Sequence, residues 1–136
     1  MAREFKIFIS HCWNYHDDLV KLRALLLNRG YFNVEFLEAS VDMPINSDRA
    51  AYVKRALKNK IISSHVVLAI AGVYATYSDW MSFELETAYG NYIPIVGISP
   101  FGQERVSRTV QNYSHQVVRW NTESIIKAIR AYAVDK

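Results

Sequence analysis

The feature that most restricts the fold of this chain is a regular alternation of strand-like and helix-like segments from end to end. Short runs rich in β-branched, aromatic and other apolar residues predict strands, and the stretches between them carry apolar residues at helical spacing. The predicted strands are 5–10, 34–37, 66–71, 93–98 and 116–120. Strands that alternate with helices through short connections predict a doubly wound α/β sheet of parallel strands.

Residues at the ends of the helical segments predict where the helices begin and end. Gly30 follows the first segment and is the expected residue at its C-terminal end. Ser47 or Asp48 is expected to cap the second helix. Ser78 or Asp79 is expected to cap the third. The predicted helices are 17–29, a second through residue 61, a third to about residue 89, 104–113, and a last one that opens at 122–124.

The number of strands and the character of the third strand narrow the topology. Residues 66–71 are apolar throughout, which is typical of a central parallel strand that is buried on both faces. For five parallel strands, the flavodoxin-like order 2-1-3-4-5 is the default. With 136 residues, 51% of them apolar, and no repeat or linker, the chain is predicted to form a single domain over residues 1–136.

Composition indicates the compartment and disfavours two classes of partner. The single cysteine, Cys12, is typical of a protein from a reducing compartment. No apolar run approaches the roughly 20 residues that span a bilayer, and no secretory signal opens the sequence. The net charge of +3 comes from scattered Lys and Arg, without a nucleic-acid-binding motif. We therefore expect a cytoplasmic protein that binds neither membranes nor nucleic acids.

Functional residues are expected at the carboxyl ends of the predicted strands, where doubly wound sheets bind their ligands. The segments at that edge are 10–13, 40–46 and 72–80. The glycine fingerprint of a dinucleotide-binding domain is missing after the first strand, and the chain has no P-loop. Bulky Trp13 and Tyr15 argue against a flavodoxin phosphate loop, and the third strand lacks the terminal aspartate of a phospho-receiver.

Three segments of the chain together resemble one family. Residues 6–11, Lys-Ile-Phe-Ile-Ser-His, are similar to the opening strand of TIR domains, and residues 37–45 occupy the position of their BB loop. Residues 78–85, Ser-Asp-Trp-Met-Ser-Phe-Glu-Leu, are similar to the signature Ser-x-Trp-Cys-x-x-Glu-Leu. Met81 replaces the usual cysteine and Ser82 a usual apolar residue. Over essentially its whole length, the chain resembles the TIR-like proteins of bacterial Thoeris anti-phage systems, the ThsB type.

This resemblance implies an activity and a catalytic residue. In enzymatic TIR domains the signature glutamate cleaves the bond between nicotinamide and ribose of NAD, so the resemblance assigns that role to Glu84. NAD is then a substrate, and neither a cofactor nor a metal is implied. The Thoeris resemblance further implies a cyclic ADP-ribose-type product that diffuses to a separate effector protein in anti-phage defence. The TIR resemblance also implies self-association.

Helical spacing places aromatic residues beside this glutamate. Tyr77, Trp80 and Glu84 lie at i, i+3 and i+7 and therefore share one face of the third helix. Glu84 and Trp80 are expected to form a pocket with a charged floor and an aromatic wall. Glu86 lies on another side of the helix and is expected to be solvated. The alternative is that Trp80 is a core residue and Glu84 a surface acid.

Four more residues of the same edge are candidates for binding the substrate. Ser10 and His11 end the first strand and are expected to contact the pyrophosphate or ribose of NAD. Ser40 and Asp42 follow the second strand and are expected to hydrogen-bond ribose or to close over the ligand. Cys12 has no nucleophile motif around it and is predicted to be a small packing residue.

Two other functions stay open at the level of sequence. Many TIR domains act through contacts between TIR domains without catalysis, so the chain is alternatively a protein-interaction module. A nucleoside deoxyribosyltransferase-like enzyme shares the expected sheet and also cleaves an N-glycosidic bond, but acts on nucleosides instead of NAD.

Overall fold

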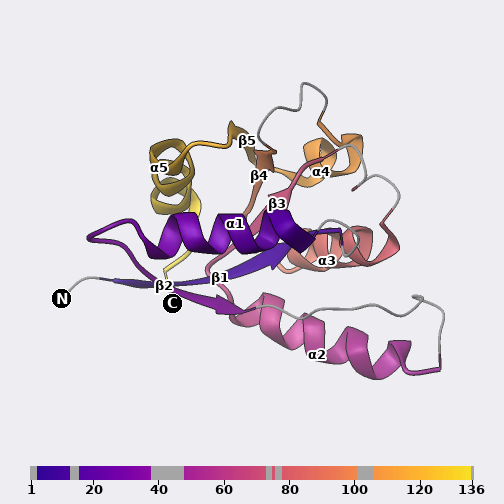
Figure 1. Cartoon of the computed structure of the whole chain (residues 1–136). Helices are drawn as coiled ribbons and strands as arrows, with labels where there is room; N and C mark the ends of the chain where they lie inside the picture. The colour runs from indigo at the N-terminus through magenta and orange to yellow at the C-terminus, as the bar shows by residue number, and fades with distance from the viewer. Residues whose placement is uncertain are drawn as a thin grey trace.

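A computed structural model describes residues 3–12, 16–37, 48–72, 75, 78–100 and 106–135. Five parallel strands form one sheet in the order β2-β1-β3-β4-β5, which confirms the predicted topology (Figure 1). The strands are β1 (Glu4–Ser10), β2 (Asn33–Leu37), β3 (Val66–Ile70), β4 (Ile95–Ser99) and β5 (Gln116–Arg119). All five residues of β3 are buried, as expected for the central strand.

Helices cover both faces of the sheet (Figure 1). They are α1 (His16–Leu27), α2 (Ala50–Ser63), α3 (Asp79–Gly90), α4 (Arg108–Tyr113) and α5 (Thr122–Tyr132). One core cluster joins α1 and α5 to the first face, through residues such as Leu22, Leu68 and Ile129. The other joins α2, α3 and α4 to the second face, through residues such as Leu57 and Leu85. The result is a three-layer α/β structure with the sheet in the middle.

The alternation of side chains along β1 decides which of them face α3. Phe5, Ile7 and Ile9 belong to the core cluster under α1 and α5, whereas Phe8 belongs to the cluster under α2, α3 and α4. Successive residues of a strand point to opposite faces, so Ser10 shares the face of Phe8. The last residue of β1 therefore points toward the layer that contains α3.

Helix ends agree with the predictions in one case and differ in two. Ser78 caps α3, and its hydroxyl accepts a hydrogen bond from Met81 N at 3.2 Å. The prediction of Ser47 or Asp48 as the cap of α2 is wrong, because a turn at Asp48 and Arg49 leads into the helix and Arg49 is the N-cap, without a side-chain capping bond. Ser47 itself lies outside the described residues.

The end of α1 is the second difference. The helix ends at Leu27 and a turn follows it, so Gly30 does not end the helix directly as predicted. The residue with left-handed backbone is Tyr31, with φ 60°, and not the glycine before it. A tyrosine takes this conformation only at a cost in backbone energy, which surrounding contacts must offset.

Two histidines stabilise the amino ends of the strands that they precede. The backbone N–H of His65 donates to Lys6 O at 2.7 Å, and its Nδ1 accepts from Lys6 N at 2.8 Å. His115 forms the same pair of bonds with Ile95, at 2.8 and 3.2 Å. Because Nδ1 accepts a hydrogen bond, the proton of each neutral ring lies on Nε2. Both rings thus extend the hydrogen bonding of the sheet by one residue.

The described helices are short. The longest of them is α2 with 14 residues, whereas a helix needs about 20 to cross a bilayer. None of the helices in the described ranges has both the length and the apolar character of a membrane span.

Candidate active site

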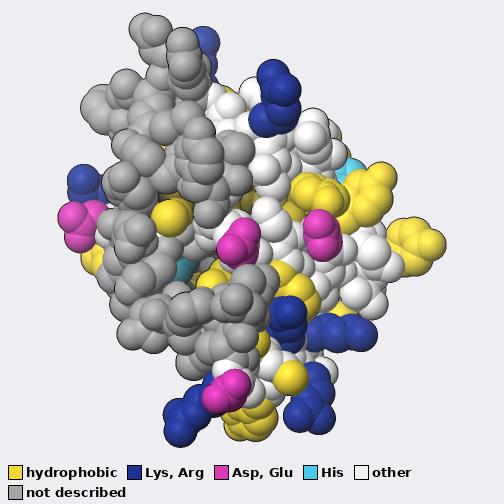
Figure 2. All heavy atoms as spheres, turned by 90° about the vertical axis from the view of Figure 1, so that its right-hand side faces the viewer, with side chains coloured by type: hydrophobic (Ala, Val, Ile, Leu, Met, Phe, Trp, Pro, Cys, Tyr) yellow, Lys and Arg dark blue, Asp and Glu magenta, His cyan; other side chains and the backbone are white. Residues whose placement is uncertain are grey.

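The carboxyl ends of the strands form the edge at which the candidate residues were expected. Figure 2 faces this side of the molecule, where acidic and basic side chains are interspersed among the described residues. At this edge β1 ends with Ser10 and is followed by His11, and α3 begins here after β3. Three predicted site residues, Ser40, Asp42 and Tyr77, lie outside the described residues, and their roles stay predictions.

Glu84 occupies a core position of α3. The buried residues of this helix are Met81, Glu84, Leu85 and Ala88, at i, i+3, i+4 and i+7, which is the spacing of an apolar face toward the core. Glu84 is only 5% exposed. The alternative of a surface acid is therefore wrong. A carboxyl group in such a position is unusual, because burying a charge costs far more than burying an apolar side chain.

The structure brings Ser10 and Glu84 together across 74 positions of sequence. Ser10 Oγ donates a hydrogen bond to Glu84 Oε1 at 2.6 Å, and both residues are buried. This contact follows from the alternation of side chains along β1, which turns Ser10 toward α3. The hydroxyl of Ser10 thus holds the carboxyl group of Glu84 in place, and its expected contact with the substrate stays a prediction.

Burial changes the acidity of Glu84. Loss of contact with water raises its pKa from 4.5 to about 8, and the hydrogen bond from Ser10 acts in the opposite direction. The protonated form therefore predominates at pH 7. A positive charge brought close to the carboxyl group would lower this pKa, because an opposite charge favours the ionised form.

Trp80 lies one turn before Glu84 and is half-buried against the core cluster under α2, α3 and α4. Its ring meets that of Phe83 edge-on, with centroids 6.1 Å apart. Lys54 of α2 lies over the ring of Phe83, with its Nζ 5.6 Å from the ring centroid. Trp80 therefore combines a core contact with partial exposure, and its role as an aromatic wall of the substrate pocket stays a prediction.

The two residues that follow β1 complete the described part of this edge. His11 is half-buried, and its expected contact with substrate stays a prediction. Cys12 is a free thiol that packs against the same core cluster as Met81 and Leu85, which agrees with the predicted packing role. Within the described ranges, no group of three or more His, Cys, Asp and Glu side chains is arranged to hold a metal ion.

Glu86 provides a natural comparison with Glu84. It lies two residues further along α3 and is exposed, as expected. Tyr113 of α4 donates a weak hydrogen bond of 3.4 Å to Glu86 Oε1. The same helix therefore carries one buried and one solvated glutamate.

Replacing Ser10 by alanine is expected to raise the pKa of Glu84 above its present value of about 8, because the hydrogen bond from Ser10 is the contact that lowers it. The change removes one hydroxyl and leaves the strand otherwise intact. Titration of the carboxyl carbon of Glu84 by NMR measures this shift. Ser10→Thr, which retains the hydroxyl, is the control, and an unchanged pKa in Ser10→Ala would contradict the contact.

Comparisons with solved structures show the fold. A 2-deoxyribosyltransferase from Bacillus psychrosaccharolyticus superposes with a TM-score of 0.60 at 18% identity, over 88% of this chain and 89% of that chain. The CMP N-glycosidase BcmB of Clostridium botulinum superposes with a TM-score of 0.55 at 13% identity, over 92% of this chain and 98% of that chain. No curated protein matches the sequence.

A comparison with family models gives a more specific result. The model for the Thoeris protein ThsB, TIR-like domain, matches residues 8–105. The match includes both Ser10 and Glu84 and extends over most of the chain. It also agrees with the resemblance of residues 6–11 and 78–85 to TIR domains. The chain therefore belongs to the family of Thoeris ThsB proteins with a TIR-like domain.

Proposed function

We propose that this chain is an enzyme that cleaves the bond between nicotinamide and ribose of NAD, with Glu84 as the catalytic carboxylate. The observation that supports this proposal is the buried carboxyl group of Glu84, held by Ser10 at the carboxyl end of β1. Perturbed acids at such an edge are typical of catalytic sites. Membership of the ThsB family supports the same reaction through the signature glutamate.

The charge of the substrate suits this carboxyl group. The nicotinamide ring of NAD is a pyridinium cation, so its approach favours the ionised form of Glu84 and releases the proton to solvent. When the bond between C1′ and the ring nitrogen breaks, the electron pair leaves with neutral nicotinamide and positive charge develops on the ribose. The carboxylate stabilises this charge, as in glycoside hydrolysis.

A nucleophile then attacks C1′ and completes the reaction. Water gives ADP-ribose and a proton, whereas an atom of the ADP-ribose unit itself gives a cyclic product and a proton. A site that excludes water favours the second outcome. We propose the cyclic product, as a diffusible signal for a separate effector in anti-phage defence, because the chain belongs to a Thoeris family.

The fold supports a second candidate substrate class. Both solved structures described above are named for reactions on nucleoside-type molecules, a 2-deoxyribosyl transfer and an N-glycosidase reaction on CMP. A buried carboxylate also suits cleavage of a neutral nucleoside. That substrate, however, brings no positive charge to lower the pKa of Glu84, so NAD is favoured.

Product analysis distinguishes these substrates. The purified protein is incubated separately with NAD, 2′-deoxynucleosides and CMP, and free base and sugar products are measured by liquid chromatography and mass spectrometry. We expect nicotinamide from NAD together with cyclic ADP-ribose-type product, and no free base from the others. Free base from a deoxynucleoside or CMP, with NAD left intact, would reject the NAD proposal in favour of the second candidate.

A further inference from the structure

The edge of the sheet opposite Glu84 carries a separate pocket. It lies at the amino ends of β1 and β2 and has a volume of about 360 Å³. This volume lies in the lower part of the range for small-molecule sites. The lining residues are Arg3, Phe5, Tyr31, Phe32, Asn33 and Arg130.

Stacked aromatic rings and two guanidinium groups line this pocket. The rings of Phe5 and Phe32 stack at 5.4 Å between centroids, with 22° between their planes. Arg3 lies over Phe5, with Cζ 4.6 Å from the ring centroid, and Arg130 lies over Phe32 at 5.6 Å. Cation–π contacts with these two rings hold the guanidinium groups in place. The arrangement is therefore ordered before any ligand binds.

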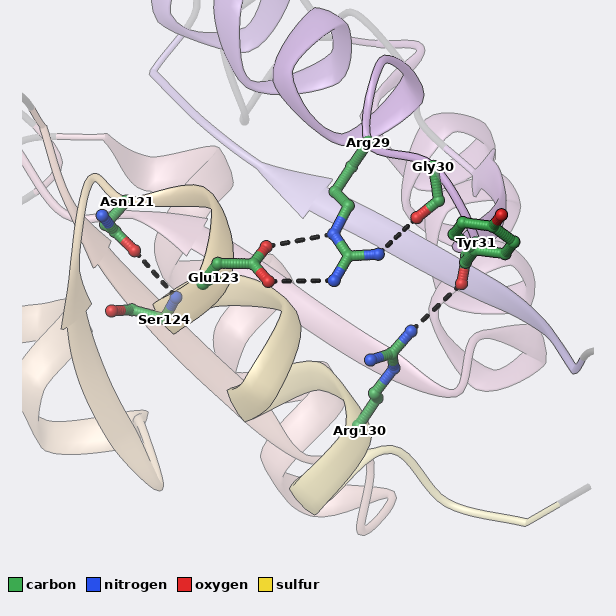
Figure 3. A network of polar contacts seen from close by, with 7 residues as sticks. All are labelled: Arg29, Gly30, Tyr31, Asn121, Glu123, Ser124 and Arg130. Atoms are coloured by element: carbon green, nitrogen blue, oxygen red, sulfur yellow. Dashed lines mark hydrogen bonds and ion pairs between the residues drawn. The ribbon is translucent and has the colours of Figure 1, made fainter.

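The balance of charge leaves the pocket positive. Glu123 is an acid whose pKa is lowered by its hydrogen bonding with Arg29 and by the charges of both Arg29 and Arg130. Its carboxylate is bound to Arg29, from which it accepts two hydrogen bonds of 2.9 and 3.0 Å (Figure 3). Arg3 forms an ion pair of 3.4 Å with Asp135. Asp135 is fully exposed, so solvent weakens the attraction between these two charges. Arg130 donates to a neutral group, the carbonyl oxygen of Tyr31, at 3.1 Å. Both pocket arginines can thus attract an anion.

Tyr31 presents an unusual aromatic surface at the mouth of the pocket. The residue is 98% exposed, and its backbone is left-handed with φ 60°. Figure 3 shows how two arginines hold this turn: Arg29 donates to the carbonyl of Gly30, and Arg130 to that of Tyr31. A strained, exposed tyrosine fixed by charged neighbours suggests a role beyond folding.

We infer that this pocket binds a phosphorylated nucleoside, with the phosphate held by the guanidinium groups of Arg3 and Arg130 and the base stacked on Tyr31. Guanidinium groups match phosphate oxygens in geometry and charge. An exposed aromatic ring offers a stacking surface to any base. Asn33 adds an amide for hydrogen bonds to the sugar or base. The site is independent of Glu84 and of the reaction proposed for it.

Calorimetric titration of the whole protein with AMP, adenosine and inorganic phosphate tests this inference. We expect AMP to bind more tightly than either part alone, and its affinity to fall with added salt, because phosphate contacts are screened. Arg3→Gln should weaken the binding of AMP. Tyr31→Gly should weaken it by at least about 5-fold through loss of stacking. Glycine adopts positive φ freely, so this variant keeps the fold.

Tyr92→Gly is the matched control. Tyr92 is also a left-handed tyrosine, with φ 61° and 89% exposure, but it precedes β4 and does not line the pocket. The Tyr92→Gly variant should bind AMP like the unaltered protein. The inference is wrong if AMP fails to bind, or if Tyr31→Gly and Tyr92→Gly bind it equally. Binding of a polyglutamate peptide without binding of AMP would instead identify a surface for acidic chains.

Discussion

Replacing Glu84 by glutamine is expected to slow the release of nicotinamide from NAD by about 10²–10³-fold. Glutamine has nearly the same shape and still accepts the hydrogen bond of Ser10, so the fold and the shape of the site are preserved. It cannot carry the negative charge that stabilises the developing cation on ribose. The decrease in rate therefore reports the contribution of the negative charge alone, without a change in packing. Initial rates of nicotinamide release at saturating NAD measure this decrease.

Glu86→Gln is the control for this experiment. It makes the same chemical change two residues away on the exposed side of α3, and it should release nicotinamide at the rate of the unaltered protein. Equal rates in all three proteins would remove Glu84 from the catalytic role. Absence of release from all three proteins would favour instead the non-catalytic interaction module, for which the charge of Glu84 is irrelevant.

Local patterns in the sequence predict most of the fold. The apolar run 66–71 identified the central strand, and the remaining strands and their order followed from alternation with helices. Ser78 was recognised as a cap because capping is a local hydrogen bond. The left-handed residue after α1 was missed, since Tyr31 depends on a contact with Arg130, 99 positions away. Long-range contacts of this kind leave no local pattern.

The site was predictable in part. The family signature located Glu84, and the spacing of Met81, Leu85 and Ala88 around it indicates a buried face, a second signal for the same residue. The partner of Glu84 follows from the period of two along β1, once α3 is known to cover the face of Phe8 and Ser10. The raised pKa was not predictable, because it depends on how completely the surrounding layers exclude water.

The sequence carries a repeated pattern at His65 and His115 that indicates their structural role. Each follows a serine and precedes a strand, in Ser-His-Val-Val and Ser-His-Gln-Val-Val. A histidine in this position has a structural use as an acceptor for the neighbouring strand. The repetition of the dipeptide before two strands could have suggested that use.

A buried acid also weakens the fold at the pH at which it is ionised, so catalysis and stability oppose each other at Glu84. Below pH 4.5 the carboxyl group is protonated in both the folded and the unfolded chain. As the pH rises toward about 8, the unfolded chain loses this proton while the folded chain keeps it. The stability that the raised pKa provides is thus fully present below pH 4.5 and is lost as the pH rises through about 8.

Glu84→Gln is therefore expected to become more stable relative to the unaltered protein as the pH rises. Each pKa unit corresponds to about 1.4 kcal/mol, so the difference in free energy of unfolding between the two proteins should change by on the order of 5 kcal/mol between pH 4.5 and pH 8. Urea unfolding of both proteins at a series of pH values measures this difference. Other titrating groups are common to both proteins and cancel in the comparison. Glu86→Gln should show no such change, and a pH-independent difference for Glu84→Gln would contradict a buried, protonated Glu84.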